Sequence, residues 1–347
     1  MILGMDTSDQ PWPKISVVLP IRNEGQYIAR TIKYLQDQDY PRDRLEILAV
    51  VGDSRDNTAE IVRQIAAQDE RVKYLHNPKS WSSAARNIGA KAATGEIITY
   101  VDGHTFIDNN QLLKNTARLM REEEVAVLSR PQFLETPDNT SFQRAVALAR
   151  RSKLGHGLDS TIYSDADEYV NPASAGATYK REVFDKVGYF DEQFDASEDY
   201  EFNYRVAQAG YRAFTSLKLA VYYYPRSSLR ALFRQMARYG TGRMRLARKH
   251  SETLGIGTLI PPLFTAALVV LPLLGLVYPL FWKVFALVYG MYVLAVLLSS
   301  FAIALHTSMS DLLVLPLIYF VIHTGLGYGF LREWFTGSLR GFKEKTT

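Results

Sequence analysis

An aspartate and a histidine lie two positions apart at the end of an apolar run. Residues 97–101 read IITYV, and Asp102, Gly103 and His104 follow directly. A divalent ion that bridges two phosphates needs an oxygen ligand of this kind, and an imidazole two residues further on can complete its coordination shell. Asp-Gly after a strand is also a common turn, so this pattern alone leaves a metal site and a plain turn open.

Two adjacent carboxylates, Glu198 and Asp199, precede an amphipathic pattern that includes Tyr200, Phe202 and Val206. A carboxylate in this place can act as a general base, which takes the proton from an attacking hydroxyl group. Acidic residues at a helix start also cap the helix and interact favourably with its dipole. The sequence therefore allows a catalytic role and a purely structural one.

A third candidate lies in residues 81–89, which read WSSAARNIG. Ser82 and Ser83 are suited to cap a helix whose free N–H groups favour phosphate, and Arg86 adds a permanent positive charge one turn further on. This arrangement predicts a phosphate contact. The alternative is an ordinary capped helix with an exposed arginine.

Strands and helices alternate in the part of the chain that holds these candidates. Apolar runs predict strands at residues 14–20, 45–51, 72–75 and 97–101. Apolar residues at helical spacing predict helices at residues 24–36, 57–69, 82–93 and 142–154. The alternation predicts an α/β fold with a mostly parallel, Rossmann-like sheet and flanking helices. Active residues are then expected at the carboxyl ends of the strands.

Residues 226–251 follow as a basic amphipathic region. Arginines alternate there with apolar residues that recur at helical spacing, namely Leu229, Leu232, Phe233, Met236 and Tyr239. This pattern is typical of a helix that lies in a membrane interface, and a solvated basic helix is the alternative. By the positive-inside rule this region is expected at the cytoplasmic face, in contact with anionic membrane lipids.

Residues 252–347 are predicted to form a transmembrane region with a basic tail. Only Lys283 and Asp311 are charged between Glu252 and Arg332. About three segments are long enough to cross a bilayer as helices, at residues 259–276, 284–304 and 312–331. Three crossings would place the tail outside, whereas its basic residues favour the cytoplasm, namely Arg332, Arg340, Lys343 and Lys345. The sequence leaves the side of the tail open.

Composition excludes several classes of protein. Cysteine is absent from the 347 residues, which excludes disulfides, thiolate zinc sites and cysteine nucleophiles. No basic region followed by a long apolar stretch opens the chain, so residues 1–225 are expected to remain in the cytoplasm. A soluble dehydrogenase is disfavoured because no G-x-G-x-x-G follows the first strand. The net charge is only +4, and we expect no nucleic-acid partner.

In their order along residues 14–239, these motifs resemble the family-2 glycosyltransferases with a GT-A fold. The matching segments are SVVLPIRNEGQYI at the first strand, SRDNT at 54–58, AARNIG at 84–89, the triplet Asp102-Gly103-His104, GATYKREVFDKVGYFDE at 176–192, Glu198-Asp199, and Gln235-x-x-Arg238-Tyr239. With its C-terminal membrane helices, the chain looks most like exopolysaccharide enzymes of the succinoglycan ExoA type.

The resemblance implies an inverting transfer from a nucleotide-diphosphate sugar, with a UDP-sugar as the first candidate. The turn from Pro20 to Glu24 would hold the nucleobase and ribose, with Asn23 and Glu24 as polar contacts. Asp102 would contact the ribose or the metal, and His104 would complete the metal shell. Magnesium or manganese would offset the charge that grows on the departing diphosphate.

Further roles follow from the same resemblance. Asp199 would take the proton from the acceptor hydroxyl, and Glu198 would help to place the acceptor. Gln235, Arg238 and Tyr239 resemble the QxxRW motif of membrane-bound polysaccharide synthases, which helps to close the site over donor and acceptor. Tyrosine in place of tryptophan keeps a stacking ring and leaves processivity undecided.

Two departures from the family pattern concern the donor site. The second strand ends in Val51-Gly52-Asp53-Ser54, whereas the family usually has an aspartate at the strand end. Asp53 would then contact the nucleobase from a shifted position, or that contact is altered. Asp-x-His in place of Asp-x-Asp makes the metal site softer without abolishing it.

The implied acceptor is a glycan linked to polyprenyl diphosphate, used in exopolysaccharide or cell-surface glycan synthesis at the cytoplasmic membrane. One alternative is transfer to a polyprenyl phosphate, an anion that needs no base, so Asp199 at the base position favours the first hypothesis. Another is a catalytically silent membrane scaffold, which the loss of both Asp102 and Asp199 would signal. The sugar, the linkage and the oligomeric state stay open.

Overall fold

The computed structural model describes residues 11–156, 162–174, 176–194 and 196–344, which fall into two compact units. The first unit runs to Gln132 and continues with Ser164–Gln193 and Asp199–Tyr222. The second holds Phe133–Tyr163, Phe194–Glu198 and the chain from Tyr223 onward. This division differs from the expected boundaries at residues 225 and 251, because two segments of the predicted catalytic domain belong to the second unit.

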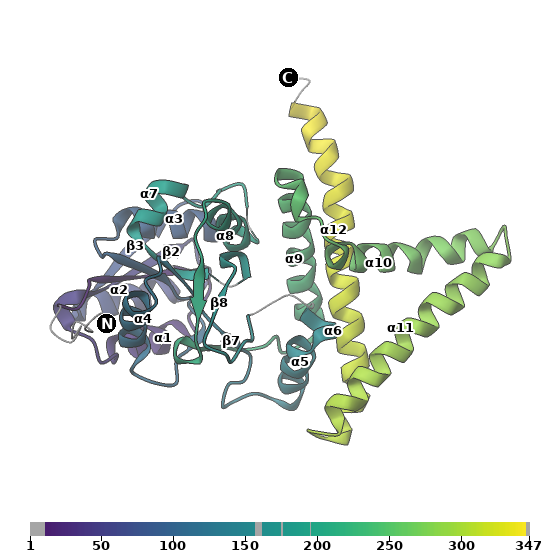
Figure 1. Ribbon diagram of the computed structural model, residues 1–347, viewed down its shortest axis with the longest axis horizontal. Coiled ribbons are helices and arrows are strands. Elements are labelled where there is room, and N and C mark those ends of the chain that lie inside the picture. The colour runs from purple at the N-terminus through teal and green to yellow at the C-terminus, as the bar shows by residue number, and fades with distance from the viewer. Residues whose placement is uncertain (1–10, 157–161, 175, 195, 345–347) are drawn as a thin grey trace, which may run out of the picture. The chain divides into compact units, whose positions relative to one another are not determined.

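A sheet lies at the centre of the first unit (Figure 1). It has eight strands in the order β3-β2-β1-β4-β9-β6-β10-β8. Its strands are β1 (Ile15–Ile21), β2 (Leu45–Gly52), β3 (Val72–Asn77), β4 (Ile97–Tyr100), β6 (Val127–Ser129), β8 (Glu168–Val170), β9 (Gly176–Lys180) and β10 (Ala213–Thr215). Strands β1 to β4 are parallel, as is the pair β6 and β10, whereas β9 and β8 run antiparallel to their neighbours. The prediction of a mostly parallel sheet is confirmed.

Helices follow the first strands in the predicted alternation. The helices of this part are α1 (Ile28–Gln36), α2 (Thr58–Gln68), α3 (Ser82–Ala92), α4 (Leu112–Glu122), α7 (Arg181–Val187) and α8 (Glu198–Gln208). Helix α1 begins four residues later than expected, because the chain first makes a turn in which Asn23 has a positive φ of 56°. Three short strands form a second sheet in the order β5 (Thr105–Phe106), β11 (Val221–Tyr223) and β7 (Gln132–Phe133).

A buried carboxylate joins three segments of the main sheet. Glu46 of β2 accepts hydrogen bonds from the Ser16 hydroxyl at 2.6 Å and from the Thr94 amide at 2.6 Å, and it pairs with the Lys73 ammonium at 2.9 Å. Burial alone would raise the pKa of Glu46, but the hydrogen bonds from Lys73, Ser16 and Thr94 outweigh it and lower the pKa to about 2. This carboxylate is therefore charged at neutral pH and stabilises the strands that carry the site.

The second unit is helical. Its helices are α5 (Ser141–Arg151), α6 (Lys153–His156), α9 (Leu229–Lys249), α10 (Ile256–Gly275), α11 (Leu280–Ala304) and α12 (Leu315–Glu344). Helices α9 and α12 lie side by side, and α10 packs on α12 and on α11 (Figure 1). Leu232 and Met236 of α9 share a buried core with Leu315 and Ile318 of α12. Two of the apolar residues of α9 that were expected to face lipid, Leu232 and Met236, are therefore covered by protein, whereas Tyr239 is exposed.

Glycines bring α12 into backbone contact with both of its neighbours. A Cβ atom at Gly329 would lie 1.9 Å from the carbonyl oxygen of Ala237 in α9. A Cβ atom at Gly327 would lie 2.3 Å from the carbonyl oxygen of Pro261 in α10. Small residues at such spacing let helices approach closely. Helix α12 is thus held between α9 and α10 through its own backbone.

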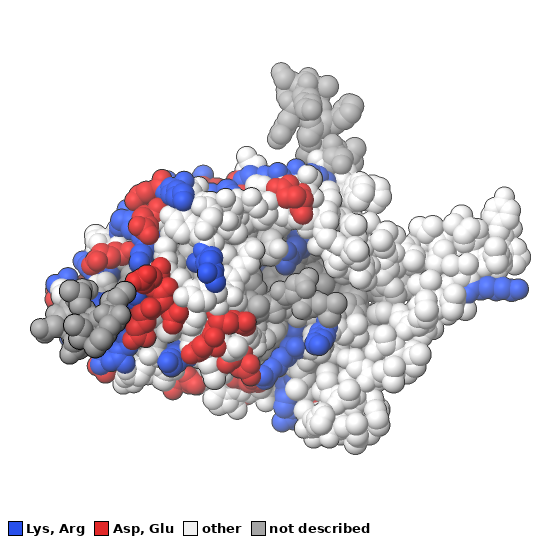
Figure 2. Space-filling model, in the orientation of Figure 1, with Lys and Arg blue, Asp and Glu red and all other residues white. Residues whose placement is uncertain are grey.

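Two helices within the described part of the chain are long and apolar enough to cross a membrane. They are α10 and α11, with mean hydropathies of 2.0 and 2.1. Figure 2 shows that their surface on the face drawn is almost free of charge, since Lys283 is their one charged residue. The third expected span, residues 312–331, falls instead in a short 3-10 helix (Met309–Leu313) and in α12. The structure therefore has two candidate spans rather than three; of the predicted tail residues, Lys345 is not among those described.

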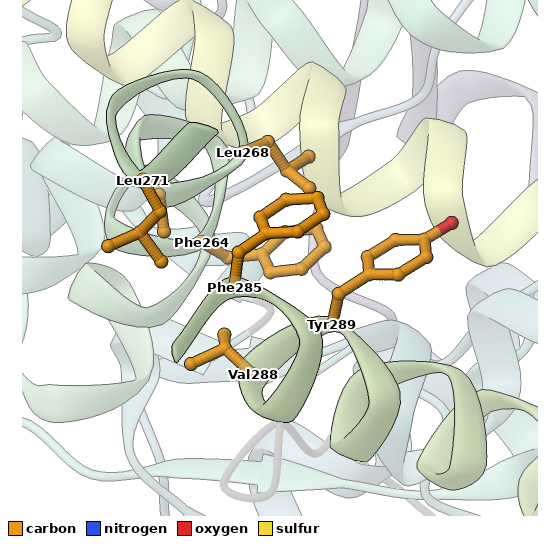
Figure 3. A pocket seen from close by; sticks show the side chains of 7 residues that line it. Phe264, Leu268, Leu271, Phe285, Val288 and Tyr289 are labelled. Atoms are coloured by element: carbon orange, nitrogen blue, oxygen red, sulfur yellow. The ribbon is translucent and has the colours of Figure 1, made fainter. Parts of the chain in front are cut away.

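An apolar hollow separates α10 and α11 in Figure 3. Its labelled side chains are Phe264, Leu268, Leu271, Phe285, Val288 and Tyr289. All of these are hydrocarbon except for the Tyr289 hydroxyl. The hollow is thus a consequence of helix packing, and it offers no charged group to a sugar nucleotide.

Candidate active site

The carboxyl ends of β1 and β4 bring Glu24 and His104 together. These two strands are parallel neighbours, so the residues that follow them meet at one edge of the sheet. The distance from His104 Nδ1 to Glu24 Oε1 is 2.9 Å, and the two side chains are 30% and 19% exposed. Because Nδ1 is engaged by Glu24, a metal contact from His104 would go through Nε2.

Asp102, two residues after the end of β4, lies beside Arg86 of α3. The distance from Arg86 Nη2 to Asp102 Oδ1 is 3.4 Å, and the side chains are 12% and 35% exposed. The Arg86 guanidinium also stands over the rings of Tyr100, at 5.0 Å, and Phe190, at 5.7 Å. Arg86 is therefore not an exposed arginine on a capped helix, because its charge is held at the edge where Asp102 emerges.

Asn23 and Glu24 tie the turn after β1 to the start of α2. The amide of Asn23 donates to the Ser54 hydroxyl at 3.0 Å, and the Asn23 side-chain oxygen accepts from the Arg55 amide at 2.8 Å. The amide of Glu24 donates to the Thr58 hydroxyl at 2.8 Å. The polar atoms of Asn23 thus shape the turn, and its expected contact with the donor stays a prediction.

Pro20 and Asp53 lie on the adjoining strands of the same edge. Pro20 is in β1, in register with Val50 of β2, and Asp53 follows β2. The Asp53 carboxylate is 73% exposed and lies 3.2 Å from Nε2 of His76 in β3. An exposed carboxylate one residue beyond the strand suits the shifted contact that the sequence predicts, and no structural observation tests it.

Asp199 is exposed at the start of α8, whereas Glu198 is buried with 6% exposure. The carboxylate of Asp199 accepts from the Tyr200 amide at 2.8 Å. Burial raises the pKa of Tyr179 well above its usual range, while Arg86 lowers this pKa and Asp199 raises it. Asp199 and Arg86 therefore both lie within electrostatic range of one buried phenol.

The sequence analysis missed Arg130, which is 3% exposed at the end of β6. Its guanidinium donates to the Tyr100 carbonyl at 2.7 Å and to the Thr178 hydroxyl at 3.2 Å, and it also bonds the Thr99 hydroxyl. Arg130 thus joins β4, β6 and β9. The available signal was an arginine directly after an apolar strand and before a proline.

The predicted motif Gln235, Arg238 and Tyr239 lies on α9 in the second unit. Nε2 of Gln235 donates to the Tyr239 hydroxyl at 3.2 Å, and the Arg150 guanidinium stands 5.7 Å from the Tyr239 ring. Arg238 is exposed. The glutamine and the tyrosine of the motif therefore orient each other along one helix face.

Among the described residues, no three His, Cys, Asp or Glu side chains are grouped so as to hold a metal ion. Asp102 and His104 provide two groups at one strand end, and both are partly exposed. Magnesium and related ions are often held by only one or two protein groups, with substrate phosphates and water completing the shell. The residues present fit such an ion.

The α/β sheet, with charged side chains gathered at the carboxyl ends of its parallel strands, defines a class of nucleotide-binding enzymes. Residues 16–188 match the model of glycosyl transferase family 2. The chain is 34% identical over 249 residues to the succinoglycan biosynthesis protein ExoA of Rhizobium meliloti (strain 1021). The aligned region covers 71% of this chain and 73% of that protein. The chain belongs to glycosyltransferase family 2, and it is a glycosyltransferase.

Two further comparisons span nearly the whole chain. A dolichyl N-acetyl-alpha-D-glucosaminyl phosphate 3-beta-D-2,3-diacetamido-2,3-dideoxy-beta-D-glucuronosyltransferase of Methanococcus voltae is 24% identical, covering 93% of this chain and 98% of that protein. The mannosyltransferase PcManGT of Pyrobaculum calidifontis, solved with GDP-Man and Mn2+, has a TM-score of 0.58 and 21% identity, covering 94% and 91%. This likeness shows the fold, which is GT-A as predicted.

Proposed function

We propose that this glycosyltransferase moves a sugar, with inversion, from a nucleotide-diphosphate donor to a membrane-associated acceptor. The donor is a UDP-sugar or a related nucleotide sugar, and the acceptor is a glycan linked to polyprenyl diphosphate. The observation that carries the proposal is the cluster at the carboxyl edge of β1 and β4. Asp102 lies there beside Arg86, and His104, two residues further along the chain, pairs with Glu24 after β1.

The donor site combines charges of both signs in a way that suits a diphosphate. Asp102 and His104 would hold a divalent ion, which when bound offsets the negative charge of the leaving diphosphate. Arg86, held by Asp102 and two aromatic rings, contributes a fixed positive charge at the same edge. PcManGT, a protein of the same fold, was solved with a nucleotide sugar and Mn2+.

Asp199 is the proposed base. It would take the proton from the acceptor hydroxyl as the new bond forms at the anomeric carbon and the bond to the diphosphate breaks. Its exposure leaves the carboxylate accessible to an acceptor, whereas the neighbouring Glu198 is buried. Glu198 would act on the acceptor only by positioning the start of α8.

The relatives and the membrane helices support a lipid-linked acceptor. The Methanococcus voltae relative is named for transfer to a sugar on dolichyl phosphate, and the Rhizobium meliloti relative is named for succinoglycan biosynthesis. A lipid-linked acceptor stays in the bilayer, so an enzyme that uses it needs membrane attachment. Helices α10 and α11 provide two spans for this purpose.

A hairpin of two spans also accounts for the basic tail. Helix α12 packs along the basic helix α9, and Glu333 of α12 lies 3.2 Å from both Arg245 and Arg248 of α9. Because an even number of crossings returns the chain to its starting side, the tail and the catalytic unit would share the cytoplasmic face. The positive-inside rule then holds at both ends of the hairpin.

Donor turnover tests the proposal. Purified chain in detergent is incubated with a panel of nucleotide sugars and manganese, with and without a polyprenyl-diphosphate-linked acceptor. We expect Asp102→Asn to abolish turnover and Asp108→Asn, an exposed carboxylate six residues on, to retain it. Efficient transfer to polyprenyl phosphate alone would favour the alternative acceptor. Absence of turnover with every donor would favour a silent scaffold.

A further inference from the structure

A buried guanidinium lies in the membrane-proximal unit. Arg150 of α5 is 9% exposed. Although burial lowers the pKa of Arg150, Tyr163 and Tyr239 outweigh it and raise this pKa above its usual value. The side chain is therefore charged. A buried charge is costly unless an opposite charge or strong hydrogen bonds compensate it.

Within the described residues, the groups recorded against Arg150 are phenols rather than carboxylates. Its neighbours are the phenols of Tyr163 and Tyr239, and no Asp or Glu of the described segments is within ion-pair distance of it. His156 packs on the Tyr163 ring, with ring centroids 4.8 Å apart. Burial, then Arg150 and Arg243, lower the pKa of His156 to about 3, so this imidazole is neutral. The charges of Arg150 and Arg243 thus both act on one neutral imidazole. Glu135, whose charge acts on Tyr163, pairs with Arg151 at 3.3 Å.

Arg150 adjoins the membrane helices. Ala149, next to Arg150, is buried in the core that α5 shares with α9, α11 and α12. Two residues after Arg150, the Ser152 hydroxyl lies 2.7 Å from that of Tyr319 in α12, which lies 2.9 Å from the hydroxyl of Ser299 in α11. An anion bound at Arg150 would therefore lie next to the helices that enter the bilayer. A phosphate carried on a lipid meets this requirement.

We propose that Arg150 and Arg243, with the hydroxyl of Tyr239, bind the diphosphate of the lipid-linked acceptor. The inference rests on the proposed function and adds the part of the enzyme that recognises the lipid end of its substrate. Guanidinium groups bind phosphate oxygens through two parallel hydrogen bonds, which fixes orientation as well as position. The hydrogen bond from Gln235 holds Tyr239 in place, which gives the motif on α9 a role in acceptor binding.

Calorimetric titration of the full chain in neutral nanodiscs tests the site. The probe is geranylgeranyl diphosphate. Geranylgeraniol, inorganic pyrophosphate and short-chain phosphatidylglycerol provide the comparisons. We expect wild type to bind the lipid diphosphate more tightly than all three. Arg150→Gln should weaken this binding about tenfold to a hundredfold, which is the effect of losing hydrogen bonds to a charged group.

Arg144→Gln is the matched control, because Arg144 is exposed on the same helix and should leave the affinity unchanged. Equal affinities of wild type and Arg150→Gln would overturn the proposal. Equal binding of phosphatidylglycerol would assign the site to bulk anionic lipid, and equal binding of pyrophosphate would assign it to a soluble anion. Either result would overturn the acceptor assignment. These titrations need no donor, so they stand apart from a failure of sugar transfer.

Thermal unfolding without ligand separates this role from a structural one. Arg150→Met keeps most of the volume and removes a charge for which the described part of the chain supplies no counter-ion. The unfolding midpoint of this variant should therefore equal or exceed that of wild type. A fall of many degrees, matched by Asp159→Asn, would identify an internal ion pair and overturn the proposal. Asp159 is chosen because it is the acidic residue nearest to Arg150 in the sequence.

Discussion

The buried carboxylate of Glu46 gives a quantitative prediction for the stability of the first unit. Its folded pKa of about 2 lies below the ordinary value of 4.5. A carboxyl group whose pKa is lower in the folded state stabilises that state at pH values above the pKa of the unfolded state. This contribution is lost as the pH falls through the pKa of the folded state. The difference of about 2.5 pKa units corresponds to roughly 3 kcal/mol at neutral pH. Most of it should disappear between about pH 4.5 and pH 2.

The perturbation is Glu46→Gln, which keeps the shape but removes the charge that faces Lys73. We expect the free energy of unfolding of the variant to be roughly 2–3 kcal/mol lower than that of wild type at pH 7. This difference should shrink steadily as the pH falls. Urea unfolding in detergent measures both. Replacing Trp282 and Trp334 by phenylalanine leaves Trp12 and Trp81, so fluorescence then reports on the first unit.

Glu60→Gln is the control for this experiment, because Glu60 is an exposed carboxylate on α2. It should change the stability by less than about 0.5 kcal/mol at any pH. A Glu46→Gln variant as stable as wild type at pH 7 would refute the reasoning. So would a difference that stays constant from neutral to acid pH, because the loss would then come from packing.

Three further predictions concern the base, the helix packing and the topology. Asp199→Asn should lower the rate of transfer about a hundredfold to ten-thousandfold with donor affinity near normal, whereas near-native transfer would return Asp199 to the role of a helix cap. Gly329→Ala should lower the free energy of unfolding by about 1–3 kcal/mol, because the added methyl group overpacks α12 against α9. At Gly290 an added Cβ meets nothing within 4 Å, so Gly290→Ala should leave the thermal unfolding midpoint unchanged. The chain has no cysteine of its own, so single cysteines can report the topology. A cysteine at Thr347 should be labelled from the cytoplasmic side, and a cysteine at Val277, in the turn of the hairpin, from the other side. Labelling of both positions from one side would disprove the two crossings.

The first half of the sheet was predictable because apolar residues dominate most of its strands. Every residue of β2 is buried, including Glu46, and the five consecutive apolar residues from Ile47 to Val51 were enough to reveal the strand. The later strands are shorter and more polar, as in β9, which reads GATYK. Their pairing depends on contacts with residues far away in the chain, so local patterns gave only weak signals.

The sequence was enough to identify candidate residues of the site, but not the residues that these side chains contact. Asp102 and His104 were found because they follow an apolar strand. The hydrogen bond between His104 and Glu24 joins residues 80 positions apart in the sequence. These residues meet only because β1 and β4 pair side by side in the sheet. Likewise, hydropathy could not show that the apolar residues of α12 face protein. The close spacing of Gly325, Gly327 and Gly329 was the available signal.

The way the two units share the chain determines how the enzyme can be shortened. A fragment that ends at residue 225 keeps α5, whose Ala145, Val146 and Ala149 are covered by residues of α9, α11 and α12. Such a fragment would expose this apolar surface and is expected to aggregate. A soluble catalytic fragment would need these alanines and the valine replaced by polar residues, or segment 133–163 replaced by a short linker, as well as removal of the membrane helices.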